Sequence, residues 1–143
     1  MKLDISNNIK NKIHTIREVQ VMLDNDLAEL YNVETKQLNQ AVKRNIKRFP
    51  KTFMFQLTDK ECESLRFQNE TLKYNDILRS QNVTSSRGGR RYLPYAFTEQ
   101  GVSMLSAILK SDTAISISIK IINAFVSMRK FISTNAQLFQ RID

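Results

Sequence analysis

The first thirty residues or so carry short apolar stretches that predict small elements. Residues 13–22 place isoleucine, valine and methionine at short intervals, which predicts a short strand or hairpin. Asp24–Asn25–Asp26 supplies side chains suited to an N-cap, so we expect a helix from Leu27 to about Tyr31. Asn32–Val33 then indicates a tight turn, because asparagine tolerates the left-handed conformation.

A second helix is expected from Glu34 or Thr35 to about Lys47. Phe49–Pro50 would end it, because the residue before a proline avoids the helical region. At about 100° per residue, one side of this helix would pack on the first helix. That inner side consists of Leu38, Ala41, Val42 and Asn45. Two helices joined by a short turn are typical of the helix-turn-helix, whose second helix enters the major groove of DNA.

The outer face of this second helix combines cations with amides and has no acidic residue. Its members are Lys36, Gln40, Lys43 and Lys47, flanked by Asn39 and Arg44, with Thr35 at the helix start and Arg48 just beyond the end. Amide side chains can pair with adenine, and lysine or arginine with guanine or phosphate. Most faces of this composition are simply solvated. The acid-free surface and the preceding helix and turn favour DNA binding over that interpretation.

Two further strands are expected at Thr52–Leu57 and Tyr92–Phe97. Between them, Thr58 and Glu61 match the capping box that starts a helix. The second strand is preceded by a tip composed of Arg87, Gly88, Gly89, Arg90 and Arg91. Paired glycines let the backbone turn tightly or approach a ligand closely. Two interpretations stay open for this tip: a wing against the DNA backbone or minor groove, and an ordinary surface hairpin.

Two helices are expected in the last third of the chain. Thr98 has the position of an N-cap for the first, whose buried residues would be Val102, Leu105, Ile108 and Leu109. Ser111–Asp112–Thr113 would cap the second. Residues 115–121 alternate strictly, which favours a strand by period alone, but apolar positions continue to Ile132 and predict a helix instead. A helix that is apolar on more than one side must bury a second face, and a homodimer is the simplest expectation.

Charge is unevenly distributed along the chain. The 143 residues, about one domain in length, carry a net charge of +8. Residues 34–51 hold six lysines or arginines against Glu34 alone, and residues 87–91 hold three arginines. These two stretches account for the whole net charge. Such concentration is the expected footprint of phosphate binding, although basic surfaces also occur on proteins that bind no nucleic acid.

The sequence offers no constellation for catalysis, for a cofactor or for a metal ion. His14 is the one histidine and Cys62 the one cysteine, whereas zinc needs several such ligands. Asp24 and Asp26 are close enough to hold a metal ion, but helix capping explains them better. Gly88–Gly89 lacks the following lysine and hydroxyl residue of a nucleotide loop. We expect neither an enzyme nor a small-molecule substrate. The lone cysteine and the lack of a long apolar run favour a cytoplasmic protein that avoids membranes.

Several stretches, in order, carry a resemblance to a known family. They are Val21–Asp24, Asp26–Ala28, Leu30–Tyr31, Glu34–Asn45, Arg48–Pro50, Phe53–Leu57, Gly88–Arg90 and Pro94–Gly101. On these stretches the chain resembles the ORF-six N-terminal domain of the KilA-N superfamily, a phage-type DNA-binding family, from Ile13 to about Arg129. The resemblance implies a DNA-binding regulator or antirepressor-like protein of phage or prophage origin, often with a coiled-coil or variable C-terminal part. Residues 65–77 are longer than the family pattern.

The fold expected is α+β: a winged helix-turn-helix-like DNA-binding domain with a small antiparallel sheet and a long C-terminal helix. Residues 1–12 would be loosely ordered, residues 13–112 would form the KilA-N-like domain, and residues 113–143 would be the dimerisation helix. The leading hypothesis is a dimeric, sequence-specific transcriptional regulator of double-stranded DNA. The residues expected to read the major groove are Lys36, Asn39, Gln40 and Lys43. Those expected to hold phosphates are Arg44, Lys47, Arg48 and residues 87–91.

Two other functions fit parts of the pattern. An antirepressor-like module would capture another regulator protein through the apolar residues 115–132. RNA binding is a third possibility, less favoured because no aromatic platform for stacking bases is evident.

Overall fold

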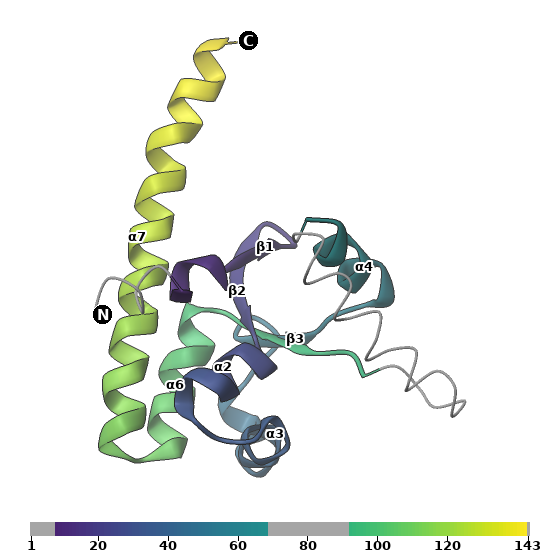
Figure 1. Ribbon diagram of the computed structural model, residues 1–143, viewed down its shortest axis with the longest axis vertical. Helices are drawn as coiled ribbons and strands as arrows, with labels where there is room; N and C mark the ends of the chain where they lie inside the picture. Colours follow the sequence, from purple (N-terminus) through teal and green to yellow (C-terminus); the bar gives the residue numbers. More distant parts are fainter. Residues whose placement is uncertain (1–7, 69–91, 143) are drawn as a thin grey trace. The chain divides into compact units, whose positions relative to one another are not determined.

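The computed structural model describes residues 8–68 and 92–142. In order, the elements are β1 (His14–Ile16), β2 (Val19–Leu23), α2 (Asp24–Tyr31), α3 (Thr35–Arg44), the 3₁₀ turn η1 (Ile46–Arg48), β3 (Met54–Gln56), α4 (Asp59–Gln68), β4 (Tyr95–Phe97), α6 (Glu99–Leu109) and α7 (Asp112–Ile142) (Figure 1). Helices and a small four-stranded sheet make the fold α+β, as expected. Contacts divide the chain into two units, residues 1–55 with 96–143 and residues 56–95.

The hairpin predicted over residues 13–22 is present. β1 and β2 are antiparallel, with His14 opposite Val21. Arg17 and Glu18 form the turn and have φ angles of 55° and 66°. A two-residue turn with both φ angles positive matches the right-handed twist of the strands that it joins. The closely spaced apolar residues of the segment 13–22 therefore belong to two paired strands.

β2 is an inner strand of the sheet, whose order is β1-β2-β4-β3. Met22 lies opposite Phe97 of β4 in an antiparallel register, and both side chains are fully buried. Phe97 also packs edge-on against Phe49, with ring centroids 5.9 Å apart. The helices add to this core Leu27, Leu38, Val102, Leu105, Ile121 and Phe125. One core thus holds the inner strands together with α2, α3, α6 and α7.

α2 begins earlier than the sequence pattern predicts. We expected Asp24–Asp26 to cap a helix starting at Leu27. Asp24 is instead the first helical residue, and Leu23, with an extended backbone, occupies the N-cap position. The predicted turn after the helix is confirmed, since Asn32 has the left-handed angles φ 60° and ψ 45°.

α3 ends earlier than predicted, at Arg44 and not at Lys47. The cause lies at Asn45, whose Nδ2 donates to the carbonyl oxygen of Ala41 at 2.8 Å. A φ angle of −123° takes Asn45 out of the helical conformation, and the chain continues as η1. Asparagine competes with helix continuation through such local side-chain bonds to the backbone.

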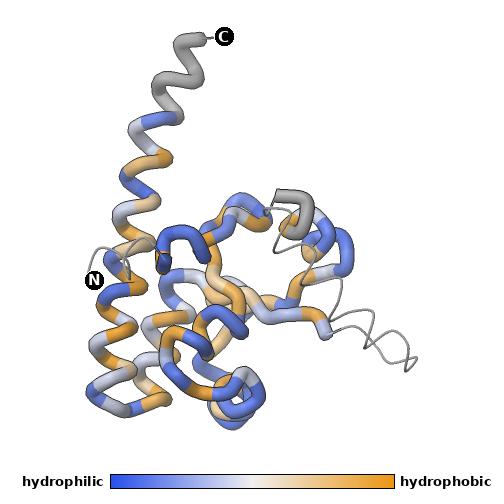
Figure 2. The backbone as a smooth tube through the Cα atoms, viewed as in Figure 1, coloured by the Kyte–Doolittle hydropathy of each residue, from blue (hydrophilic) through white to orange (hydrophobic). Residues whose placement is uncertain are grey.

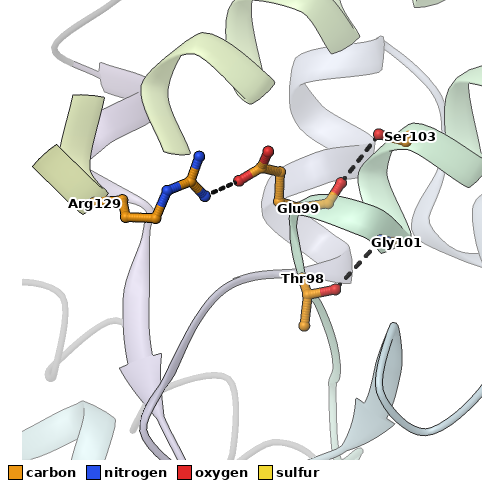
Figure 3. A network of polar contacts seen from close by, with 5 residues as sticks. All are labelled: Thr98, Glu99, Gly101, Ser103 and Arg129. Atoms are coloured by element: carbon orange, nitrogen blue, oxygen red, sulfur yellow. Dashed lines mark hydrogen bonds and ion pairs between the residues drawn. The ribbon is translucent and has the colours of Figure 1, made fainter. Parts of the chain in front are cut away.

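The N-terminal turn of α6 meets α7 through a small polar network (Figure 3). Thr98 caps α6 as predicted, because its Oγ1 accepts a hydrogen bond from the backbone N of Gly101 at 3.3 Å. The Oγ of Ser103 donates to the carbonyl oxygen of Glu99. The carboxylate of Glu99 forms an ion pair with the guanidinium of Arg129 on α7.

α7 is helical from Asp112, which confirms that the alternation over residues 115–121 does not mark a strand. Ser111 caps it, its Oγ accepting from the backbone N of Ala114 at 3.0 Å. At 1.5 Å per residue α7 is roughly 46 Å long and α6 only about 16 Å, so α7 extends well past its neighbour (Figure 1). Among the described residues, no helix is long and apolar enough to cross a membrane.

Part of the N-terminal stretch expected to be loosely ordered has a defined place. Residues 8–11 are helical, and Ile9 is only 1% exposed. Lys12 Nζ lies 3.2 Å from Glu29 Oε2 of α2. The apolar side chain of Ile9 and this ion pair attach the segment to its unit, while residues 1–7 lie outside the described residues.

The second unit begins with the predicted capping box. The backbone N of Thr58 donates to Oε1 of Glu61 at 2.8 Å, and the backbone N of Glu61 donates to Oγ1 of Thr58 at 3.2 Å. These reciprocal bonds start α4 at Asp59. Leu57 N donates to the carbonyl oxygen of Pro94 at 2.9 Å, which joins the two ends of the unit.

The strands expected on either side of the arginine-rich tip are shorter than predicted. Thr52–Leu57 reduces to β3, and Tyr92–Phe97 reduces to β4. The two are neighbours in the sheet, but α4 lies between them in the chain, so they are not arms of one tight hairpin. The tip itself, residues 87–91, lies outside the described residues.

Candidate nucleic-acid interface

α3 presents a polar and cationic face to solvent. The exposed residues of this helix are Lys36, Gln37, Gln40, Lys43 and Arg44. Hydrophilic residues predominate along it in Figure 2, and it contains no acidic residue. Within the described ranges, none of its three cations forms an ion pair. The face therefore offers amide groups beside cations that no described carboxylate neutralises.

The opposite face of α3 holds the helix in the core. Leu38 is fully buried and Val42 is 3% exposed. The two are four residues apart, which places them on one side of the helix. α3 packs there against α2 and α6. Of the four residues predicted for this inner side, Ala41 and Asn45 are only half-buried.

The amide of Asn39 is engaged inside the protein. Its Nδ2 donates to Oδ2 of Asp24 at 2.9 Å. Asp24 is fully buried, and its Oδ1 also accepts from the backbone N of Asn25 at 2.8 Å. This bond joins the first residue of α2 to the middle of α3. The base contact predicted for Asn39 stays a prediction, and the structure adds that its amide links α3 to α2.

The cations beyond Asn45 lie on a different element from those of α3. Lys47 and Arg48 are exposed on η1. Lys51, three residues after η1 ends, is exposed as well. The helical wheel that grouped Lys47 with Lys36 therefore does not apply, because the helix has already ended. η1 is itself fixed by the adjoining Phe49, which is 4% exposed.

The remaining predicted site residues divide into two cases. Thr35 is the first residue of α3 and is half-buried. Arg87, Gly88, Gly89, Arg90 and Arg91 lie outside the described residues. The described interface therefore rests on α3 and η1.

Helix electrostatics account for some of these cations but not for all. Lys43 and Arg44 lie in the last turn of α3, where a positive charge stabilises the helix by about 0.3–1 kcal/mol. Lys36 lies in the first turn, where the helix dipole disfavours a cation. Glu34 at the N-cap is acidic, but the first turn itself contains no acid. Stability alone does not explain a lysine at that position.

Sequence reasoning missed Gln37 on this face. The backbone N of Glu34 donates to Gln37 Oε1 at 3.4 Å, so the side chain helps to start the helix. The pattern of Glu34 followed three residues later by glutamine is a capping box that the sequence displays. The same pattern fixes Glu34 as the residue before the helix, which the sequence left open between Glu34 and Thr35.

Asp24, one of the two aspartates close enough in the sequence to hold a metal ion, lies in the core. Asp24 is buried and bonded to Asn25 and Asn39, which leaves it in the core and not at a surface. Over residues 8–68 and 92–142, no group of three or more His, Cys, Asp or Glu side chains is arranged to hold a metal ion.

Fold and surface together define an α+β domain in which two helices joined by a short turn present a basic helix to solvent. A family model described as the ORF6N domain matches residues 11–108. The chain belongs to the ORF6N domain family, which confirms the resemblance drawn from its sequence stretches. No curated protein and no solved structure matches the chain.

Proposed function

We propose that this protein binds double-stranded DNA sequence-specifically through the outer face of α3, as a transcriptional regulator of phage or prophage type. The observation that carries the proposal is the exposed, acid-free face of α3 with Lys36 in its first turn. Because α2 and α6 hold its other side, this helix would serve as the recognition helix that enters the major groove.

The side chains of this face have two roles in the proposal. Lys36 lies in the first turn of α3, and in helix-turn-helix proteins the N-terminal residues of the recognition helix contact base edges. Gln40 follows about one turn later and is exposed as Lys36 is. Glutamine pairs bidentately with adenine, and lysine with guanine. Lys43, which the sequence grouped with the groove-reading residues, lies in the last turn of α3, and we assign it to phosphate instead. The other residues assigned to phosphates are Arg44, Lys47 and Arg48. Asn39 contributes by fixing the orientation of α3 through Asp24.

A titration of fluorescently labelled genomic DNA fragments, followed by anisotropy over a salt series, tests the proposal. Affinity should fall steeply with salt, because each phosphate contact releases condensed counterions. Lys36→Ala combined with Lys43→Ala should weaken binding at least tenfold and, because Lys43 is the one of the two assigned to phosphate, reduce the log–log salt slope by about 1. Gln40→Ala should reduce the preference for the tight fragments over random DNA.

The matched control replaces two exposed lysines elsewhere, Lys60→Ala with Lys120→Ala. It removes the same net charge from another part of the surface. If the α3 face makes the contact, this control should leave the DNA affinity nearly unchanged. Equal weakening by both double variants would reduce the effect to overall charge and reject the interface. Tighter binding to a single-stranded RNA competitor than to duplex DNA would favour the RNA interpretation.

A further inference from the structure

One apolar stripe of α7 faces away from the core. Ile115 is 47% exposed and Ile119 is 55% exposed, while Ile122 and Val126 are half-buried. At about 100° per residue these four side chains fall within roughly 60° of one another. The core side of the helix is a different one and carries Ala114, Ser118, Ile121 and Phe125, all buried.

The spacing of the stripe is that of a helix–helix seam. The intervals of four, three and four residues match the a and d positions of a heptad, with Ile119 and Val126 at a and Ile115 and Ile122 at d. Scattered apolar side chains on a surface need no explanation. Four β-branched residues in heptad register form a seam of the kind that packs against another helix.

We propose that this stripe binds the same stripe of a second copy of the chain, with the two α7 helices antiparallel. In that arrangement Ile119 faces the partner's Ile122, and Ile115 faces the partner's Val126. The contact is self-complementary, because each pair occurs twice about a two-fold axis. It therefore closes into a dimer and does not propagate.

Charge decides between the two helix directions. Continuing the heptad spacing by one position at each end reaches Asp112 before the stripe and Arg129 after it. Antiparallel packing places Asp112 opposite the partner's Arg129 at both ends of the seam. Parallel packing would place Asp112 beside the partner's Asp112 and Arg129 beside the partner's Arg129, and such like-charge pairs oppose association.

The stripe is already organised for this contact. α7 is packed along α6, capped by Ser111 and tied to Glu99 through Arg129, so the seam needs no folding on association. The side chain of Arg129 remains 59% exposed beside Glu99. A guanidinium has five donors, so it can bind Glu99 and a second carboxylate together.

Light scattering after size exclusion, over a concentration series, tests the dimer and does not depend on DNA binding. The wild-type mass should approach twice 16.6 kDa, and Ile119→Asp should return it to 16.6 kDa. The matched control is Phe131→Asp, which alters a side chain 64% exposed on another side of the same helix and should leave the dimer intact. A wild-type monomer at all concentrations, or dissociation by Phe131→Asp alone, would overturn the proposal.

Disulfide trapping tests the direction and still reports if Ile119→Asp fails to fold. Both variants carry Cys62→Ser, which removes the one natural thiol. Mixing Ile115→Cys with Val126→Cys should give a cross-linked heterodimer, because facing seam residues come within disulfide reach. Ile115→Cys alone should not cross-link, since antiparallel helices hold its two copies about 16 Å apart along the axis. Cross-linking of Ile115→Cys alone would establish a parallel pair and reject the proposed arrangement.

Discussion

The phenol oxygen of Tyr31 lies 2.6 Å from Oγ of Ser118, a hydrogen bond between two buried residues 87 positions apart in the chain. Either hydroxyl can donate. Tyr31 ends α2 and Ser118 lies in the N-terminal part of α7, so the bond joins the helix that precedes α3 to the C-terminal helix. Burial raises the pKa of Tyr31 to about 12, and the hydrogen bond to Ser118 acts in the opposite direction.

Removing one hydroxyl of this pair should destabilise the protein. Tyr31→Phe leaves Oγ of Ser118 buried without this partner, so the free energy of unfolding should fall by about 1–3 kcal/mol in urea denaturation. Adding Ser118→Ala to Tyr31→Phe should recover part of the loss, because no orphaned hydroxyl remains. Additive effects of the two substitutions would mean that the hydroxyls do not interact.

The raised pKa of Tyr31 predicts a loss of stability at alkaline pH. The folded state holds the phenol proton more tightly than the unfolded state, whose tyrosine ionises near 10.0. The stabilisation is therefore complete below pH 10 and is lost as the pH rises through about 12. Its size is on the order of 3 kcal/mol, at about 1.4 kcal/mol per pKa unit.

Comparison with Tyr31→Phe isolates this effect from other titrations. Urea unfolding of both proteins should give a difference in stability that is constant at neutral pH and shrinks above pH 10. If the two stability curves run parallel across that range, Tyr31 does not titrate as proposed.

Asn39 and its neighbour Gln40 should respond differently to truncation. Asn39→Ala leaves the buried Asp24 carboxylate without one of its donors, so the free energy of unfolding should fall by about 1–3 kcal/mol. Gln40 is exposed, and Gln40→Ala should change stability by no more than about 0.5 kcal/mol. DNA affinity of the folded fraction should fall more for Gln40→Ala. The opposite order in both measurements would return Asn39 to the role of base reader.

Gly101 occupies a position that no other residue fits. A Cβ there would overlap the carbonyl oxygen of Phe53, which also accepts from the backbone N of Thr98 at 2.9 Å. Gly101→Ala should therefore lower stability by about 1–3 kcal/mol, although alanine is intrinsically the better helix former by roughly 1 kcal/mol. Ser103→Ala, at an exposed site in the same helix, is the control. A raised thermal midpoint for Gly101→Ala would contradict the close approach.

Lys110 offers a stabilising substitution. It joins α6 to α7 with a left-handed φ of 50°, a conformation that costs an L-residue roughly 1 kcal/mol. Lys110→Gly should remove that strain and raise stability by about 0.5–1 kcal/mol in thermal melts. Lys110→Ala keeps the Cβ and should show no gain. Equal gains in both variants would assign the effect to lost charge.

Local contacts explain why much of the chain could be predicted from its sequence. The caps at Thr58, Thr98 and Ser111 each join a side chain to a backbone group three residues away. The left-handed turn at Asn32 depends on the same short range. Such contacts form within one turn of helix, so residue types at fixed spacing are enough to reveal them. The cations of α3 and its buried residues Leu38 and Val42 could also be identified from the sequence, because they follow from residue type and helical spacing alone.

Tertiary structure decided the features that join distant segments. The hydrogen bond from Asn39 to Asp24 depends on how α2 meets α3, and no helical wheel contains that angle. The close approach of Gly101 to Phe53 and the bond from Tyr31 to Ser118 likewise depend on packing between elements far apart in the chain. The apolar pattern of α7 showed that two faces exist, but only its packing on α6 and α2 determined that Ile115 and Ile119 stay exposed. Periodicity establishes which residues share a face of a helix, and the neighbouring elements determine which of those faces is buried.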